Sequence, residues 1–203
     1  DLPIALGFIL ATKQAGFDHK NKLFVGELAL DGIVRSIHGT LPIALLAKEK
    51  GFQERYVPRL NAPEASVVDG IKIIPVDNLY LLTSHLIGNK IIEPHPQAVF
   101  SNSLPEENYL LDMSHVHGQE HAKRALEIAA AGGHNVLLNG PPGSGKTLLA
   151  KTMPTILPRL DFSEALEITK IFSVAGRLPR DKGLVVQRPY RSPHHSASAV
   201  SLV

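Results

Sequence analysis

The 203-residue sequence contains no cysteine and no tryptophan, and only 5% of its residues are aromatic. Without cysteine the chain can form neither a disulfide nor a zinc-thiolate site. No apolar run approaches the ~18 residues of a membrane-spanning helix, and the first residues lack the basic segment of a secretory signal peptide. We therefore expect a cytoplasmic protein. Because the chain starts with Asp1 rather than methionine, we also expect an internal fragment of a longer protein.

Charge is unevenly distributed, although the formal net charge is only +2. Acidic residues outnumber basic ones before Ser114, and the reverse holds from there to Val203. The basic residues of one irregular stretch are Arg177, Arg180, Lys182, Arg188 and Arg191. Such a cluster is typical either of a solvated surface or of contacts with a nucleic-acid phosphate backbone. No motif for reading bases accompanies it, so sequence-specific recognition is not expected.

Alternating strand and helix patterns predict a mixed α/β domain over residues 1–88. The expected helices cover 2–15, 41–50, 62–68 and 78–87, and the expected strands cover 23–30, 33–37, 56–57 and 71–74, with a hairpin turn at Asp31-Gly32. Residues 89–113 are polar and contain three prolines, which indicates an interdomain linker. Residues 114–203 are expected to form a second domain with helices over 119–131 and 163–174, the latter with Ser163 as its N-cap.

Eight consecutive residues match the phosphate-binding pattern G-x-x-x-x-G-K-[ST]. They are Gly140, Pro141, Pro142, Gly143, Ser144, Gly145, Lys146 and Thr147. The glycines let backbone N–H groups point toward nucleotide phosphates. Lys146 can reach the outer phosphates, and the Thr147 hydroxyl can bind Mg²⁺. An apolar strand is expected before this loop, at 134–139, and a helix after it, at 148–153. A simple turn would not require the lysine and the threonine, so the sequence predicts a site for ATP and Mg²⁺.

Residues around this loop resemble the magnesium-chelatase branch of the AAA+ ATPases. The segments that carry the resemblance are Val116-His117-Gly118-Gln119, the helix from Ala122 to Ile128, and 134–151. Residues 188–198, with the sequence RPYRSPHHSAS, resemble the competence-protein (ComM-type) subgroup. The resemblance implies that 114–203 is the first part of a P-loop AAA+ domain. It also implies that Val116, His117, Gly118 and Gln119 lie against the adenine. For the full-length protein it implies a hexameric ring that acts on DNA in recombination or natural transformation.

The first half resembles the Lon-protease-like domain that these proteins place before their ATPase. The matching segments are 1–5, 25–32 and 41–44. Lon-type proteases use a Ser–Lys dyad in which the lysine activates the serine. The serine segment would precede Asp1, and Leu41-Pro42 stand where the lysine would fall. We therefore expect this domain to be catalytically inactive, and the chain not to be a protease.

ATP hydrolysis needs an acidic pair near Mg²⁺ and an arginine from a neighbouring subunit. The carboxylates after Thr147 are Asp161, Glu164, Glu167 and Asp181, and none follows an apolar strand. The resemblance places the hydrolytic residues after 188–198. We expect the chain to bind ATP and to contain no catalytic residue.

Two histidine pairs and two other functions remain open. His117 and His121 have the i, i+4 spacing of metal ligands on a helix, but no carboxylate accompanies them, which favours solvated histidines or histidines at the nucleotide. His194 and His195 are adjacent and point apart, so they fit a DNA or subunit contact as well as a structural role. The alternative functions are the ATPase subunit of magnesium chelatase and a non-enzymatic assembly or docking module.

Overall fold

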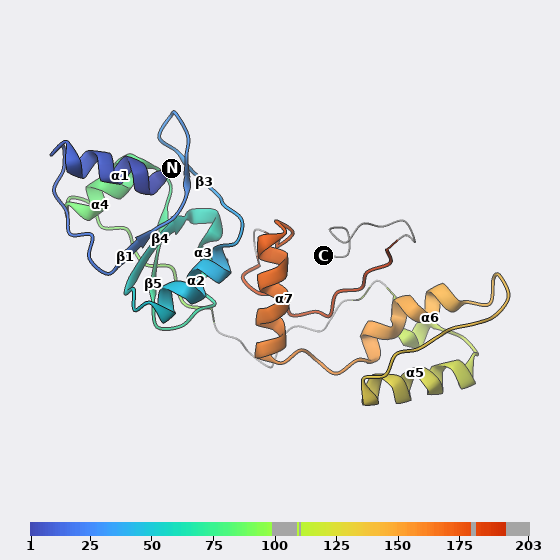
Figure 1. Cartoon of the computed structure of the whole chain (residues 1–203). Helices are drawn as coiled ribbons and strands as arrows, with labels where there is room; N and C mark the ends of the chain where they lie inside the picture. The colour runs from blue at the N-terminus through green and yellow to red at the C-terminus, as the bar shows by residue number, and fades with distance from the viewer. Residues whose placement is uncertain (99–108, 110, 180–181, 194–203) are drawn as a thin grey trace. The chain divides into compact units, whose positions relative to one another are not determined.

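The computed structural model describes residues 1–98, 109, 111–179 and 182–193. Two compact units are present (Figure 1). The first takes its residues from Asp1–Phe100 and Leu166–Val185, and the second from Ser101–Ala165 and Val186–Leu202. The predicted domain limits of 1–88, 89–113 and 114–203 remain predictions. Residues of the segment Leu166–Val185 pack with the first unit, although they follow the glycine loop in the sequence.

The first unit is a mixed α/β fold, as predicted. Its elements are α1 (Leu2–Ala11), β1 (Lys22–Phe24), β2 (Glu27–Leu28), β3 (Val34–Arg35), α2 (Thr40–Glu49), β4 (Glu54–Pro58), η1 (Arg59–Asn61), α3 (Ala62–Ala65), β5 (Lys72–Val76) and α4 (Leu79–Leu86). Strands β1, β4 and β5 form a parallel sheet in that order, with Tyr56 opposite both Phe24 and Ile74. Parallel neighbours require crossover connections, which α2 and α3 supply.

Alternation along the two longer strands builds apolar layers on both faces of the sheet. Tyr56, Ile74 and Val76 pack with Leu2 and Leu6 of α1 and Leu82 of α4. On the other face, Val57 and Ile73 pack with Ala62 and Ala65 of the α3 segment. Leu166 and Leu184 add to a third cluster with Leu41, Ala44, Val67 and Val68. Residues far along the chain therefore complete the core of the first unit.

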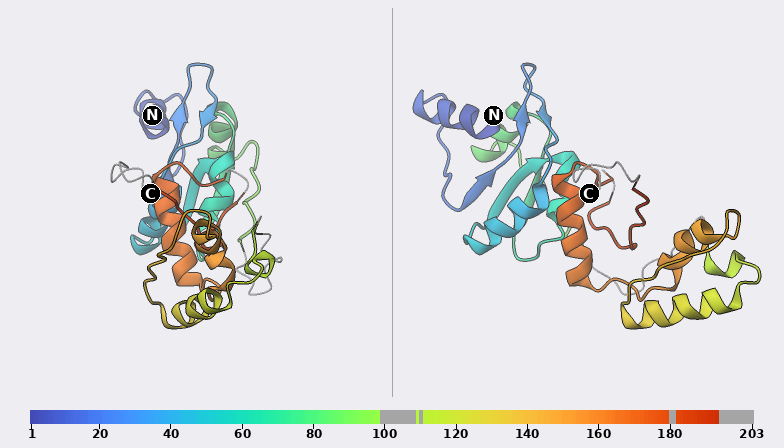
Figure 2. Two further views of the ribbon diagram at one scale, coloured as in Figure 1. Left: turned by 90° about the vertical axis from the view of Figure 1, so that its right-hand side faces the viewer. Right: turned by 45° about the vertical axis from the view of Figure 1, so that its right-hand side comes forward.

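The predicted hairpin at Asp31-Gly32 is confirmed, but the predicted strand before it is divided. Strands β2 and β3 pair antiparallel (Figure 2), and the Asp31 carboxylate accepts a hydrogen bond from the Ile33 N–H at 3.0 Å. Gly26 separates β1 from β2 at φ +154°. A Cβ at this position would lie 2.7 Å from a methyl of Val34 in β3, so only glycine lets the backbone at residue 26 approach β3 this closely.

The second unit contains η2 (Met113–His115), α5 (Glu120–Gly132), α6 (Lys146–Thr152) and η3 (Met153–Ile156). Helices α5 and α6 lie side by side (Figure 1), and Val116, Leu126 and Leu149 form their buried core. The strand predicted over 134–139 is wrong: these residues are irregular, and Leu137 is 92% exposed. A strand is stable only when its N–H and C=O groups pair with a neighbour, and the described part of this unit contains no other strand.

Helix α7 (Phe162–Val174) was predicted from its pattern, but its predicted N-cap, Ser163, is wrong. The Asp161 carboxylate accepts from the Glu164 N–H at 2.8 Å, and the Glu164 carboxylate accepts from the Asp161 N–H at 3.2 Å. This is a capping box, in which both exposed amides gain a partner.

Replacing Asp161 with alanine is expected to destabilise α7 by about 1 kcal/mol, because the Glu164 amide loses its acceptor. Ser163→Ala, two residues further along the chain, is the matched control. It is expected to change the stability of α7 by less than about 0.5 kcal/mol. Hydrogen exchange of the first amides of α7 measures both. Equal loss of protection in the two variants would show that Asp161 is not the cap.

Among the described residues, no helix combines the length and apolar character needed to span a membrane.

Candidate functional site

The glycine loop of the second unit leads directly into α6. Gly143 and Gly145 have φ values of +77° and +84°, which turn the backbone in a way that other residues adopt only with strain. Gly145 is the residue before the helix, and no side chain caps the helix start. The N–H groups of Gly143, Gly145, Lys146 and Thr147 donate to no acceptor among the described residues. These amides are therefore available to an anionic ligand.

The Lys146 side chain folds back over the same loop. Its Nζ donates to the carbonyl oxygens of Gly140 and Pro141, each at 2.8 Å, and lies 3.3 Å from Ser144 Oγ. Uncharged acceptors therefore hold the ammonium at the loop, and no carboxylate of the described residues pairs with it. A phosphate oxygen is a stronger acceptor for this ammonium than a carbonyl.

The segment predicted to lie at the adenine is brought to the glycine loop. Gly118 and Gln119 both adopt left-handed backbone conformations, with φ +67° and +59°, immediately before α5. The Gln119 side-chain amide donates to the Ser144 carbonyl at 3.4 Å. Val116 is buried in the core, whereas His117, Gly118 and Gln119 are exposed. The structure thus connects two segments that the sequence separates by more than twenty residues.

The Asp112 carboxylate stabilises the turn that precedes the Val116–Gln119 segment. Asp112 accepts a hydrogen bond from the Ser114 N–H at 2.8 Å and starts the turn η2. The hydrogen bonds from Ser114 lower the pKa of Asp112 below its usual range. Asp112 therefore stays ionised at neutral pH and keeps the turn that leads to Val116.

The residues present fit a nucleotide with Mg²⁺. Lys146 and the free amides supply positive potential for phosphates, and the exposed Thr147 hydroxyl can supply one metal ligand. The carboxylates that follow have other roles: Asp161 caps α7, and Glu164 also pairs with Arg188 at 2.9 Å. Glu167 is exposed, and Asp181 lies outside the described residues.

The fold does not arrange His117 and His121 as a pair of metal ligands. His117 precedes α5 and His121 lies within it, so the two do not share a continuous helix face. No group of three or more His, Asp or Glu side chains suited to a metal occurs among the described residues. His194 and His195 lie outside the described residues.

The basic cluster is divided between the two units. Arg177 and Lys182 belong to the first unit, whereas Arg188 and Arg191 belong to the second. Arg188 donates to the Pro158 carbonyl at 2.7 Å and pairs with Glu164. Arg180 lies outside the described residues. Sequence proximity alone therefore does not place these five cations on one surface.

The position expected for a protease lysine has no base. Leu41 is fully buried, and its N–H donates to the Glu64 carboxylate at 2.7 Å. Beside it in the first unit lies a pocket of about 110 Å³. Its polar lining residues are Ser36, His38, Asn61, Glu64, Ser173 and Lys182. No sequence pattern predicts this pocket, because its residues come from distant segments and form no motif.

Comparisons with known proteins match both halves of the chain. The family described as "Magnesium chelatase, subunit ChlI" matches residues 112–203, and the family described as "Subunit ChlI of Mg-chelatase" matches residues 1–61. The first of these segments contains the whole glycine loop and the segment from Val116 to Gln119.

Two individual relatives match over the full chain and a third matches a short part of it. Competence protein ComM of Haemophilus influenzae is 39% identical over 205 residues, which cover 100% of this chain and 40% of that protein. Protein YifB of Escherichia coli is 40% identical over 205 residues, covering 100% of this chain and 39% of that protein. An archaeal Lon protease of Archaeoglobus fulgidus is 43% identical over 49 residues, 24% of this chain and 8% of that protein.

These matches define a magnesium-chelatase-like protein that also shares a short stretch of similarity with archaeal Lon proteases. Within that class the chain belongs to the ComM-type family that includes YifB. The predicted family and fold class are thereby confirmed. The chain spans about 40% of the length of the curated relatives that it matches.

Proposed function

We propose that the chain binds ATP with Mg²⁺ at residues 140–147, as part of a ComM-type AAA+ motor. Two observations on the glycine loop carry the proposal. Uncharged oxygens hold the Lys146 ammonium, and several amides of the same loop have no acceptor among the residues that the structure describes. Nucleotide and Mg²⁺ use is general in the magnesium-chelatase-like family, which supports the assignment.

In this proposal each residue has a defined task. Lys146 and the amides of Gly143, Gly145 and Thr147 hold the phosphates, and the Thr147 hydroxyl holds Mg²⁺, which neutralises phosphate charge when bound. Gln119, tied to the loop through Ser144, positions the Val116–Gln119 segment at the base. The carboxylates Asp161 and Glu164 serve the helix cap, so the described residues support binding rather than hydrolysis.

The metal assignment is tested by Thr147→Val, with Thr147→Ser as the matched control. We expect wild type and the serine variant to bind ATP more tightly in Mg²⁺ than in EDTA. The valine variant should lose about tenfold or more of that enhancement, because it loses one metal ligand. Titration with a fluorescent ATP analogue measures the ratio. A valine variant that keeps the full Mg²⁺ enhancement would remove Thr147 from the metal site.

For the full-length protein we propose a cytoplasmic ring-forming motor that acts on DNA in recombination or natural transformation. The similarity to a protein named competence protein supports this choice over metal insertion into porphyrin. The resemblance of residues 1–5, 25–32 and 41–44 to a Lon-protease-like domain favours the same choice. The buried Leu41 supports a docking or assembly role for the first half rather than proteolysis. DNA-stimulated ATPase activity of the full-length protein supports the motor, whereas porphyrin metallation without a DNA effect overturns it.

A further inference from the structure

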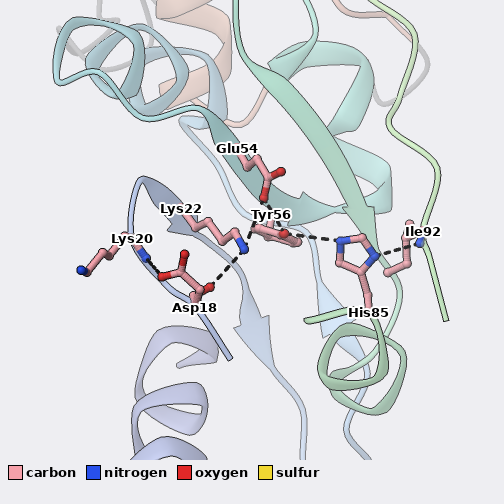
Figure 3. Close-up of polar contacts among 7 residues, drawn as sticks. All are labelled: Asp18, Lys20, Lys22, Glu54, Tyr56, His85 and Ile92. Carbon is pink, nitrogen blue, oxygen red and sulfur yellow. Dashed lines mark hydrogen bonds and ion pairs between the residues drawn. The ribbon is translucent and has the colours of Figure 1, made fainter. Parts of the chain in front are cut away.

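His85 of α4 belongs to a chain of hydrogen bonds in the first unit (Figure 3). The Tyr56 hydroxyl lies 2.9 Å from Glu54 Oε2 and 3.4 Å from His85 Nε2. On the other side of the ring, the backbone N–H of Ile92 donates to Nδ1 at 2.9 Å. Because an amide N–H can only donate, Nδ1 must carry no proton, and the neutral ring holds its proton on Nε2.

The position of this proton fixes the donor and the acceptor of the two remaining hydrogen bonds. His85 Nε2–H donates to the Tyr56 oxygen, and the Tyr56 hydroxyl donates to the Glu54 carboxylate. Burial, followed by the hydrogen bond and negative charge of Glu54, raises the pKa of Tyr56, so its hydroxyl stays protonated. Phe24 stacks on the Tyr56 ring with centroids 4.7 Å apart and fixes its position.

The charged residues that influence the His85 ring lie on strands β4 and β1. Glu54 of β4 favours the protonated ring, and Lys22 of β1, 3.7 Å from Glu54, opposes it. Lys22 is held in place by the Asp18 carbonyl at 3.1 Å. The segment that contains Ile92 contributes an uncharged backbone amide to the ring. Burial, the strongest influence, lowers the pKa of His85 below its ordinary value of about 6.5.

Ile92 lies in an extended segment, residues 89–98, which we call the strap. Other backbone bonds also hold the strap. The N–H groups of Asn89 and Lys90 donate to the Ser84 carbonyl at 2.9 and 3.2 Å. The His95 N–H donates to the Ile73 carbonyl at 2.8 Å, and the Ala98 N–H to the Ser66 carbonyl at 3.1 Å. The Ile92 side chain packs against the apolar cluster that includes Tyr56 and Leu82. In the sequence, the strap directly precedes the residues of the second unit. The His85 ring is therefore a titratable acceptor for the strap, whose other anchors described above are hydrogen bonds between backbone groups.

We propose that His85 is a pH-sensitive latch, and that protonation at Nδ1 releases the strap around Ile92. A protonated ring presents N–H to N–H on the strap side, so that hydrogen bond is lost. Donation from Nε2 to Tyr56 is unaffected, which confines the change to the strap. Because the folded state disfavours the charged ring, the contribution of the latch to stability is complete above about pH 6.5. It is lost as the pH falls from there through the lowered pKa of His85.

Hydrogen exchange of the full 203-residue chain at about pH 7.5 and about pH 5 tests the latch, with rates expressed as protection factors to remove intrinsic pH effects. In wild type the Ile92 amide should lose tenfold or more of its protection at the lower pH. His85→Asn should stay protected at both values, because its Oδ1 takes the place of Nδ1 and does not titrate. His85→Ala should be unprotected at both.

Two further measurements separate this latch from general acid effects. His95→Gln removes the histidine of the strap itself and should leave the wild-type pH response intact. Nitrogen chemical shifts of the His85 ring at neutral pH should report the Nε2–H form. The proposal is overturned if the ring is protonated on Nδ1 at neutral pH, if His95→Gln abolishes the response, or if His85→Asn loses protection at low pH as wild type does.

Discussion

Lys146→Ala is expected to weaken ATP binding by about 100-fold or more while the fold stays intact. Within the described part of the chain, the acceptors of the Lys146 ammonium are the neutral oxygens of Gly140, Pro141 and Ser144, so the ammonium is available to phosphate oxygens. Each charge-assisted hydrogen bond to a phosphate contributes about 1.5–3 kcal/mol, and each 1.4 kcal/mol corresponds to about tenfold in affinity. Titration of the chain with a fluorescent ATP analogue gives the two dissociation constants.

Lys151→Ala provides the matched control. Lys151 lies on the same helix, is exposed, and is outside the phosphate-binding pattern. The control should bind the analogue as wild type does, and far-UV circular dichroism should be unchanged for both variants. If Lys146→Ala binds the analogue as tightly as Lys151→Ala, the glycine loop is not the nucleotide site.

Replacing Glu64 with alanine is expected to produce the largest loss of stability, about 3–5 kcal/mol. Glu64 is 93% buried, since only 7% of it is exposed. Its carboxylate accepts from the Leu41 N–H, from the Ser173 hydroxyl and, at 3.4 Å, from the Asn61 side chain. The substitution leaves these donors buried without an acceptor, at a cost of about 1–3 kcal/mol for each unsatisfied group. Urea denaturation followed by far-UV circular dichroism measures the loss.

The exposed Glu49, at the end of α2, is the control for Glu64. Glu49→Ala should change the free energy of unfolding by less than about 0.5 kcal/mol. A double-mutant cycle of Glu64→Gln with Ser173→Ala should show positive coupling, because the two side chains contact each other directly. Equal stabilities of the Glu64 and Glu49 variants would contradict the assigned role.

Local patterns were sufficient for most elements of the first unit. The turn at Asp31-Gly32 follows from residue types within a few positions, and so does the end of α2 at Glu49, two residues before the left-handed Gly51 at φ +77°. Boundaries were less accurate: the helix predicted to reach residue 15 ends at Ala11, and Lys13 adopts φ +57° beyond it. No side-chain pattern predicts a left-handed lysine, because that conformation depends on how the chain packs after the helix.

The glycine-loop pattern, the family and the lack of a lysine at Leu41-Pro42 were determined by the sequence alone. Each depends on residue types at consecutive positions: Gly140–Thr147 in the first case and Leu41-Pro42 in the last. Only the tertiary structure decided that 134–139 is irregular, that the basic cluster is divided, and that Ser173 pairs with Glu64. It also decided that His85 meets Ile92 and Tyr56. These outcomes depend on partners that are distant in the chain, since strands, buried carboxylates and buried imidazoles are stable only when their hydrogen bonds are satisfied.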